Sequence, residues 1–165
     1  MIELDLRLTE RLRIAEQPGI LRTASAILAH SGDSWFWLAG LAVLWWLGTG
    51  YWKRELLIMI ISILAAALLV FVVKRLVPRR RPEGEWGKFY RLTDPGSFPS
   101  GHSVRAFMLA VILLGMSPGI GFVLLIWAPL VGLARVAMGL HYLSDVLAGM
   151  LLGVLIGGIT LLVVL

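Results

Sequence analysis

The sequence predicts an all-α integral membrane protein, a bundle of five to six transmembrane helices preceded by an amphipathic N-terminal segment. Of the 165 residues, 59% are hydrophobic and only 15% are charged, against about 25% charged in a typical soluble domain. The mean hydropathy is +0.88. A soluble protein of this size could not bury so much apolar surface, so lipid must cover part of it. We expect a single membrane-embedded domain over residues 1–165, with interfacial helices in 1–31 and the helical core in 34–165.

The first segment, residues 2–16, mixes leucines with charges of both signs. Leu4, Leu8 and Leu12 share one helical face, which favours an amphipathic helix at the membrane surface. The same residues also alternate as in a strand, but an isolated strand could not satisfy its backbone in lipid. The interspersed charges exclude a secretory signal peptide here. Residues 20–31 are apolar but short, so a second helix is expected to be interfacial or partly inserted, and whether residues 17–31 span stays open.

The rest of the chain consists of long uncharged runs. The turn Ser31-Gly32-Asp33-Ser34 is a plausible N-cap. The 19 residues from Ser34 to Trp52 are uncharged and carry Trp and Tyr towards both ends, as in an aromatic belt. Between Arg105 and Arg135 lie 29 uncharged residues, too many for one helix, and Pro118 divides them. Such runs are long enough to cross about 30 Å of hydrocarbon. The predicted spans are residues 34–52, 56–77, 99–116, 119–138 and 146–165.

One long polar loop, residues 78–98, interrupts this pattern and carries five basic residues. Loops of this length are commonly functional. Because successive spans cross in opposite directions, this loop, the start of the next span and the turn near Gly139 fall on the same membrane face. The polar residues of the apolar segments therefore converge there, at the ends of four helices. They are Lys74, Arg81, His102, Arg135, His141 and Asp145.

These residues suit phosphate chemistry. Lys74, Arg81 and Arg135 place three positive charges together, which favours an anion between them. Ser100 and Gly101 open a helix, whose free N–H groups and dipole add to an anion site. Taken singly, a basic residue at a helix end is more often a snorkelling anchor. Taken together at one face, they favour a function.

Two histidines and a carboxylate complete the candidate site. His141 and Asp145 are four residues apart on one helical face, so the carboxylate can orient the imidazole as in a nucleophile-activating pair. His102 would then protonate the departing oxygen. The basic residues would neutralise the phosphate charge, so no metal and no cofactor is expected. With no cysteine, cysteine-ligated metals are excluded.

The three motifs Lys74-x6-Arg81-Pro82, Pro99-Ser100-Gly101-His102 and Arg135-x5-His141-x3-Asp145 resemble those of the type 2 phosphatidic acid phosphatase family. Its superfamily includes lipid phosphate phosphatases, polyprenyl diphosphate phosphatases and, more distantly, vanadium haloperoxidases. The resemblance implies metal-independent hydrolysis through a phosphohistidine on His141, supported by Asp145, with His102 as the acid. It implies phosphate binding by Lys74, Arg81, Ser100, Gly101 and Arg135. The family's third motif usually begins with serine, and this chain has Ala134 there, so weaker phosphate binding or altered substrate preference is expected.

The membrane side of the site has two opposing indications. The resemblance implies a multi-pass protein of the cell membrane with its site on the outer face, whereas the excess of Lys and Arg in residues 78–98 points to the cytoplasm. The substrate is expected to be a lipid phosphate or diphosphate, such as phosphatidate, phosphatidylglycerol phosphate or a polyprenyl diphosphate. The expected partners are this substrate and the bilayer, without nucleic acid, and the oligomeric state stays open.

Basic residues outside the motifs leave an alternative. These are Arg75, Arg79, Arg80, Lys88 and Arg91. They could favour a diphosphate or simply bind lipid headgroups. A non-catalytic protein that binds anionic lipids or moves them across the bilayer would explain them, but it would leave the histidines without a task.

Overall fold

A computed structural model describes residues 2–84, 86, 94 and 96–164 of the chain. All regular structure in this part of the chain is helical, and one isolated antiparallel bridge joins Arg80 to Gly96. The predicted all-α class is therefore confirmed, and the strand alternative for residues 2–8 is wrong. The helices are α1 (Ile2–Leu12), α2 (Ile20–Ser31), α3 (Ser34–Leu47), α4 (Tyr51–Leu76), α6 (Gly101–Met116), α7 (Pro118–Ala137) and α8 (Leu143–Val164).

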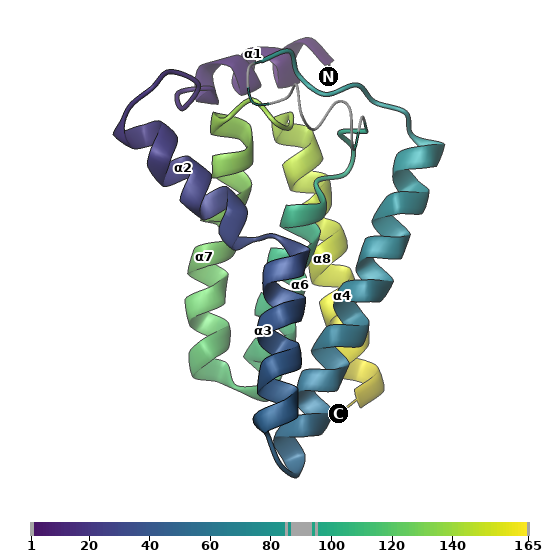
Figure 1. Cartoon of the computed structure of the whole chain (residues 1–165). Helices are drawn as coiled ribbons and strands as arrows, with labels where there is room; N and C mark the ends of the chain where they lie inside the picture. The colour runs from purple at the N-terminus through teal and green to yellow at the C-terminus, as the bar shows by residue number, and fades with distance from the viewer. Residues whose placement is uncertain (1, 85, 87–93, 95, 165) are drawn as a thin grey trace.

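Helices α3, α4, α6, α7 and α8 run up and down along a common direction, while α1 lies across one end of them (Figure 1). The same end carries the end of α7 and the start of α8, and α6 begins a little below them. At the opposite end, Arg54 near the start of α4 donates a hydrogen bond to the carbonyl of Val164 in α8. This arrangement brings together the helix ends that the sequence predicted to converge.

Three of these helices are long and apolar enough to cross a membrane among the described residues, namely α4, α7 and α8. The apolar helices α3 and α6 are shorter, with 14 and 16 residues, or about 21 and 24 Å at 1.5 Å per residue. The predicted spans thus all correspond to helices, but the structure supports three full-length crossings by length and composition. The predicted run 34–52 is divided, because α3 ends at Leu47 and α4 already begins at Tyr51.

Close packing of α6 on α8 forms the centre of the bundle. Gly149, Gly153 and Gly157 recur every fourth residue along α8 and face α6. A Cβ at Gly153 would lie only 2.3 Å from the carbonyl oxygen of Val104. The absent side chains therefore let the two backbones approach, as in other membrane helix pairs.

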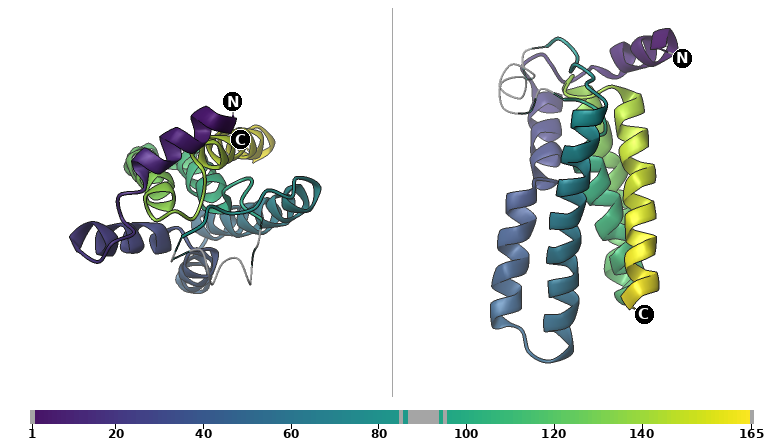
Figure 2. Two further views of the ribbon diagram at one scale, coloured as in Figure 1. Left: turned by 90° about the horizontal axis from the view of Figure 1, so that it is seen from above. Right: turned by 90° about the vertical axis from the view of Figure 1, so that its right-hand side faces the viewer.

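The N-terminal helix α1 is tied to the start of α8, as the view along the bundle also indicates (Figure 2). Thr9 Oγ1 accepts a hydrogen bond from the N–H of Leu143 at 3.0 Å, and Asp5 Oδ1 accepts one from the N–H of Ser144 at 2.9 Å. These are the first N–H groups of α8, which have no partner inside the helix. Helix α1 therefore caps α8 from a distant part of the sequence.

Candidate active site

A cavity of about 250 Å³ lies where α4, α6 and the end of α7 meet. Its lining combines an apolar wall from α4 with a set of charged and polar groups. The polar lining residues are Ser34, Lys74, Arg81, Asp94, His102, Arg105, Arg135 and His141, and Gly101 adds backbone.

Six of the eight site residues predicted from the sequence line this cavity, and the other two lie behind it. Ser100 is fully buried as the N-cap of α6, and its hydroxyl makes no hydrogen bond within the described part of the chain. Asp145 is fully buried next to His141. The predicted convergence is therefore observed.

His141 is buried in the turn between α7 and α8, with its two ring nitrogens in different surroundings. Arg81 Nη1 lies 3.0 Å from Nε2. Since a guanidinium can only donate, Nε2 is the acceptor and the proton is on Nδ1. Burial lowers the pKa of His141 to about 3, more than the nearby Asp145 carboxylate can raise it. The imidazole is therefore neutral, with its lone pair on Nε2.

The Asp145 carboxylate lies beside Nδ1 of His141, but its short contacts go elsewhere. Oδ2 is 3.6 Å from Nδ1, which is too long for a hydrogen bond. Oδ2 accepts instead from the N–H of Tyr142 at 2.9 Å, and Oδ1 accepts from Arg79 Nη1 at 2.7 Å. His141 and Asp145 are thus adjacent, as predicted. A hydrogen bond between Nδ1 and Oδ2 requires the two side chains to move slightly closer.

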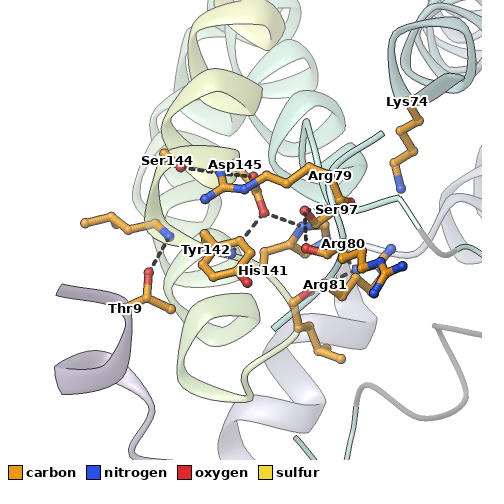
Figure 3. A network of polar contacts seen from close by, with 12 residues as sticks. Thr9, Lys74, Arg79, Arg80, Arg81, Ser97, His141, Tyr142, Ser144 and Asp145 are labelled. Atoms are coloured by element: carbon orange, nitrogen blue, oxygen red, sulfur yellow. Dashed lines mark hydrogen bonds and ion pairs between the residues drawn. The ribbon is translucent and has the colours of Figure 1, made fainter. Parts of the chain in front are cut away.

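Arg79 lies beside Asp145 and Ser144 at the start of α8 (Figure 3), and it also connects this carboxylate to the N-terminal helix through Asp5. Its Nη2 donates to Asp5 Oδ2 at 2.6 Å, and its Nη1 also reaches Ser144 Oγ at 2.6 Å. The guanidinium lies 4.0 Å from the centre of the Tyr142 ring. Arg79 is therefore not the spare cation for lipid headgroups that the sequence suggested. It neutralises a buried carboxylate, as a buried charge requires.

Asp94 lies between two of the predicted phosphate ligands. Its Oδ2 pairs with Lys74 Nζ and accepts from Arg81 Nη2 at 2.8 Å. Its backbone carbonyl accepts from Arg81 Nε, also at 2.8 Å. This carboxylate therefore occupies the place where the sequence predicted an anion, with one oxygen shared by Lys74 and Arg81.

His102 also has a carboxylate partner, which the sequence did not assign. Its Nε2 lies 2.7 Å from Oδ1 of Asp33, and the other oxygen of Asp33 lies 3.0 Å from Nδ1 of His30. Asp33 is the N-cap of α3 by position, but its side chain makes no capping bond. The N-cap predicted at this turn is therefore Asp33 by position, but its side chain does not cap the helix, because two histidines contact both of its oxygens.

Sequence reasoning thus missed Asp33, Asp94, Arg105 and Arg79. Arg105 carried a signal, since a charge four residues into an apolar span needs a partner. Asp33 and Asp94 carried none, because each lies in a polar turn or loop where an acidic residue is ordinary. Two of the spare basic residues, Lys88 and Arg91, lie outside the described residues.

The sequence model of the PAP2 superfamily matches residues 55–165 of the chain. The chain belongs to this superfamily. The resemblance inferred from the three motifs is therefore confirmed, and the matched residues contain all eight predicted site residues, whereas Asp5 and Asp33 precede them.

Two named relatives extend the likeness beyond these residues. The chain is 31% identical over 148 residues to decaprenylphosphoryl-5-phosphoribose phosphatase of Mycobacterium tuberculosis, covering 88% of this chain and 81% of that protein. It is 31% identical to lipid A 1-phosphatase of Rhizobium etli, covering 84% of this chain and 69% of that protein.

Two solved structures share the fold. The transmembrane PAP2-type phosphatidylglycerolphosphate phosphatase of Bacillus subtilis superposes with a TM-score of 0.76 at 25% identity, over 96% of this chain and 83% of that one. LpxE of Aquifex aeolicus gives a TM-score of 0.75 at 26% identity, over 96% and 94%.

The family's usual serine position, occupied by Ala134, does not line the cavity. Ala134 is buried in a small apolar cluster with Ala29 and Ala137, where α2 packs on α7. The expected effect of this departure on phosphate binding stays a prediction.

Proposed function

We propose that this chain is an integral-membrane, metal-independent phosphatase that hydrolyses a lipid phosphate or diphosphate through a phosphohistidine on His141. One observation carries the proposal. The acceptor nitrogen of a neutral, buried histidine faces a cavity lined by Lys74, Arg81 and Arg135. A phosphate bound by these cations would lie within reach of that nitrogen, and the cations would stabilise the charge on its oxygens.

In the first step, Nε2 of His141 attacks phosphorus while the ester bond to the leaving oxygen breaks. Arg81, which donates to Nε2 in this structure, turns its N–H groups to the phosphate oxygens and frees the lone pair. Asp145 closes on Nδ1–H and stabilises the positive ring. His102 gives its proton to the leaving oxygen, which departs as an alcohol or a lipid monophosphate.

In the second step, water attacks phosphorus and the P–N bond breaks. His102 takes the proton of the water, so that inorganic phosphate leaves and both histidines return to their starting states. The N-terminal end of α6, with Ser100 and Gly101, offers its free N–H groups to the phosphate in both steps.

The lining of the cavity and the relatives both support the proposed substrate class. The α4 side of the cavity is apolar, with Ala66, Ala67, Val70 and Phe71. The substrate's phosphate would bind among the cations while its acyl or prenyl chain stays against α4 and in lipid. The named relatives act on a polyprenyl-linked phosphate and on a lipid A phosphate, which supports this class. Phosphatidate, phosphatidylglycerol phosphate and polyprenyl diphosphates remain the candidates.

We further propose that the whole chain forms one membrane domain in which α3, α4, α6, α7 and α8 cross the bilayer. Helix α2 adds about 18 Å to the short α3, so the two together make one broken crossing. In this proposal the site lies on the outer face of the cell membrane, as the family resemblance implies. Because the chain has no cysteine, single cysteines at Arg80 and Thr49 can test this. An impermeant thiol reagent should label the Arg80 position in intact cells, and labelling at Thr49 instead would reverse the orientation.

Phosphate release by the purified protein tests the activity. In detergent with EDTA, the wild type should release phosphate from at least one of the candidate lipids, and His141→Ala should abolish this. A radiolabelled substrate should leave an acid-labile, base-stable phosphoryl group on the protein. If the EDTA-treated wild type releases no phosphate from any of them, the alternative of a lipid-binding or lipid-translocating protein is favoured.

A further inference from the structure

The turn between α2 and α3 lies deep beside the cavity, although it interrupts an otherwise apolar part of the chain. The backbone carbonyl of Gly32 accepts hydrogen bonds from Arg105 Nε at 2.9 Å and Nη2 at 2.6 Å. Trp127 Nε1 donates to Ser31 Oγ at 2.9 Å. Non-helical backbone is tolerated at membrane depth only where protein satisfies it or a cavity adjoins it. Here α6 and α7 supply the partners.

The centre of the turn also packs closely against α7 and α6. A Cβ at Gly32 would lie 2.9 Å from Val131 Cγ1 and 3.3 Å from Cδ2 of His102. This contact presses the turn against the imidazole and brings Asp33 to it. The carboxylate contact with Nε2, at 2.7 Å, is much shorter than the 3.6 Å between Asp145 and His141.

We propose that Asp33 is the positioning residue of His102, holding the ring by Nε2 so that Nδ1 faces the substrate and the protonated ring keeps a counter-ion. This inference rests on the proposed function, in which His102 is the acid. The site would then contain two histidine–carboxylate pairs. One is the family's pair on the start of α8, and the other joins α6 to a turn outside the residues that match the family.

The charges around the ring explain why a carboxylate is needed there. Arg105 and Arg135 line the same cavity as His102, and both disfavour a positive imidazole. Asp33 provides the opposite charge at hydrogen-bond distance, which stabilises the imidazolium that must form when His102 holds a proton. His30, whose side chain is half exposed, holds the second oxygen of Asp33 from the outside.

Proton movement in this arrangement balances over one turnover. The Nε2 proton stays on the ring, shared with Asp33, throughout. The Nδ1 proton goes to the leaving oxygen as the P–O bond breaks, and the attacking water returns one to Nδ1 in the second step. Asp33 itself never gives up or takes a proton, so Asn at this position keeps the shape and removes only the charge.

Dependence on the leaving group tests the proposal. An alkoxide leaving group needs a proton, whereas a stabilised phenolate does not. The two substrates are dioctanoyl phosphatidate and para-nitrophenyl phosphate, and the measured quantity is kcat/KM, which reports the steps up to leaving-group departure. Asp33→Asn should lower kcat/KM for phosphatidate about 10- to 100-fold, within the range for acid catalysis, and for the aryl phosphate about threefold or less.

Comparing His102→Ala with Asp33→Asn distinguishes a failure of the acid role of His102 from a failure of the positioning role of Asp33. If His102→Ala lowers kcat/KM equally for both substrates, the acid role in the proposed function fails. The positioning role of Asp33 fails if His102→Ala lowers kcat/KM mainly for phosphatidate but Asp33→Asn lowers it equally for both substrates. It also fails if Asp33→Asn has the same kcat/KM values as the wild type. The double variant should lose no more than His102→Ala alone, because Asp33 acts only through His102. Additive losses would contradict that.

Fold effects are controlled by a matched acid-to-amide change. Asp5→Asn also removes a part-buried carboxylate, but one that contacts Ser144 and Arg79 and not His102. It should lower the activity towards both substrates by the same factor. Inhibition by inorganic phosphate should be unchanged in Asp33→Asn, because the predicted phosphate ligands are untouched.

Discussion

Replacing Asp5 should destabilise the protein although it lies in the short helix α1 across the end of the bundle. Its carboxylate accepts from the N–H of Ser144 at 2.9 Å, from the hydroxyl of Ser144 at 2.6 Å and from Arg79 at 2.6 Å. Loss of an N-cap costs about 0.5–2 kcal/mol, and loss of a hydrogen bond to a charged group about 1.5–3 kcal/mol. Because these contributions overlap and the side chain is 12% exposed, we expect a loss of about 2–4 kcal/mol for Asp5→Ala.

The assay is unfolding of the purified protein in one fixed detergent, followed through the fluorescence of its seven tryptophans. Glu3→Gln is the matched control on the same helix, since Glu3 is 78% exposed and, among the residues that the structure describes, pairs with Arg7 one turn away. Such a surface pair contributes about 0.3–0.5 kcal/mol. Asp5→Asn keeps one acceptor oxygen and should fall between the two. If Asp5→Ala and Glu3→Gln have the same free energy of unfolding, the capping of α8 by α1 does not stabilise the fold.

The pH dependence gives an independent check on the same carboxylate. Burial raises the pKa of Asp5, but the hydrogen bonds from Ser144 and Arg79 outweigh it and leave the pKa below its ordinary value of 3.8. The stabilisation is therefore complete above that value and is lost as the pH falls through the lower, folded-state pKa. The difference between wild type and Asp5→Asn should be constant near neutral pH and shrink only below pH 3.8. A difference that shrinks already between pH 7 and 5 would contradict this.

Two further predictions concern the anion site and the helix packing. Asp94→Asn removes the carboxylate that competes with phosphate for Lys74 and Arg81. Inorganic phosphate should therefore inhibit this variant about three- to tenfold more strongly than the wild type. Weaker inhibition would show that Asp94 instead organises the site. Gly153→Ala forces a Cβ to within 2.3 Å of a backbone oxygen of α6 and should cost about 1–3 kcal/mol as overpacking, whereas Gly158→Ala, with no atom within 4 Å, should be neutral in the same unfolding assay.

The sequence predicted most of this architecture because lipid imposes a simple rule on it. An uncharged run in a membrane must be helical, so the positions of the helices and the alternation of their directions followed from hydropathy alone. The convergence of Lys74, His102 and His141 was a consequence of that alternation, and the cavity confirms it. Helix ends were less well predicted, because α4 takes in Lys53, Arg54 and Glu55, which read as a polar connection.

The contacts around the site could not be predicted in the same way. Asp5 and Ser144 are 139 residues apart, and Asp33 and His102 are 69 apart. No periodicity links such pairs, and each acid had a satisfactory local explanation as a surface or capping residue. Arg79 was equally ambiguous, since Arg79, Arg80 and Arg81 are adjacent and only the fold decides which faces Asp145.

The hydrogen bonds between α1 and the start of α8 also have a consequence for the biosynthesis of the protein. Helix α1 leaves the ribosome more than 130 residues before the start of α8, so Asp5 has no partner in α8 while the helices between them insert. Contacts that close so long a loop form late. Docking of α1 onto α8 would then occur only in a chain whose helices have all been synthesised and inserted. A chain that stops short of α8 would keep Asp5 and Thr9 exposed, a difference that a membrane protease could use to remove incomplete copies.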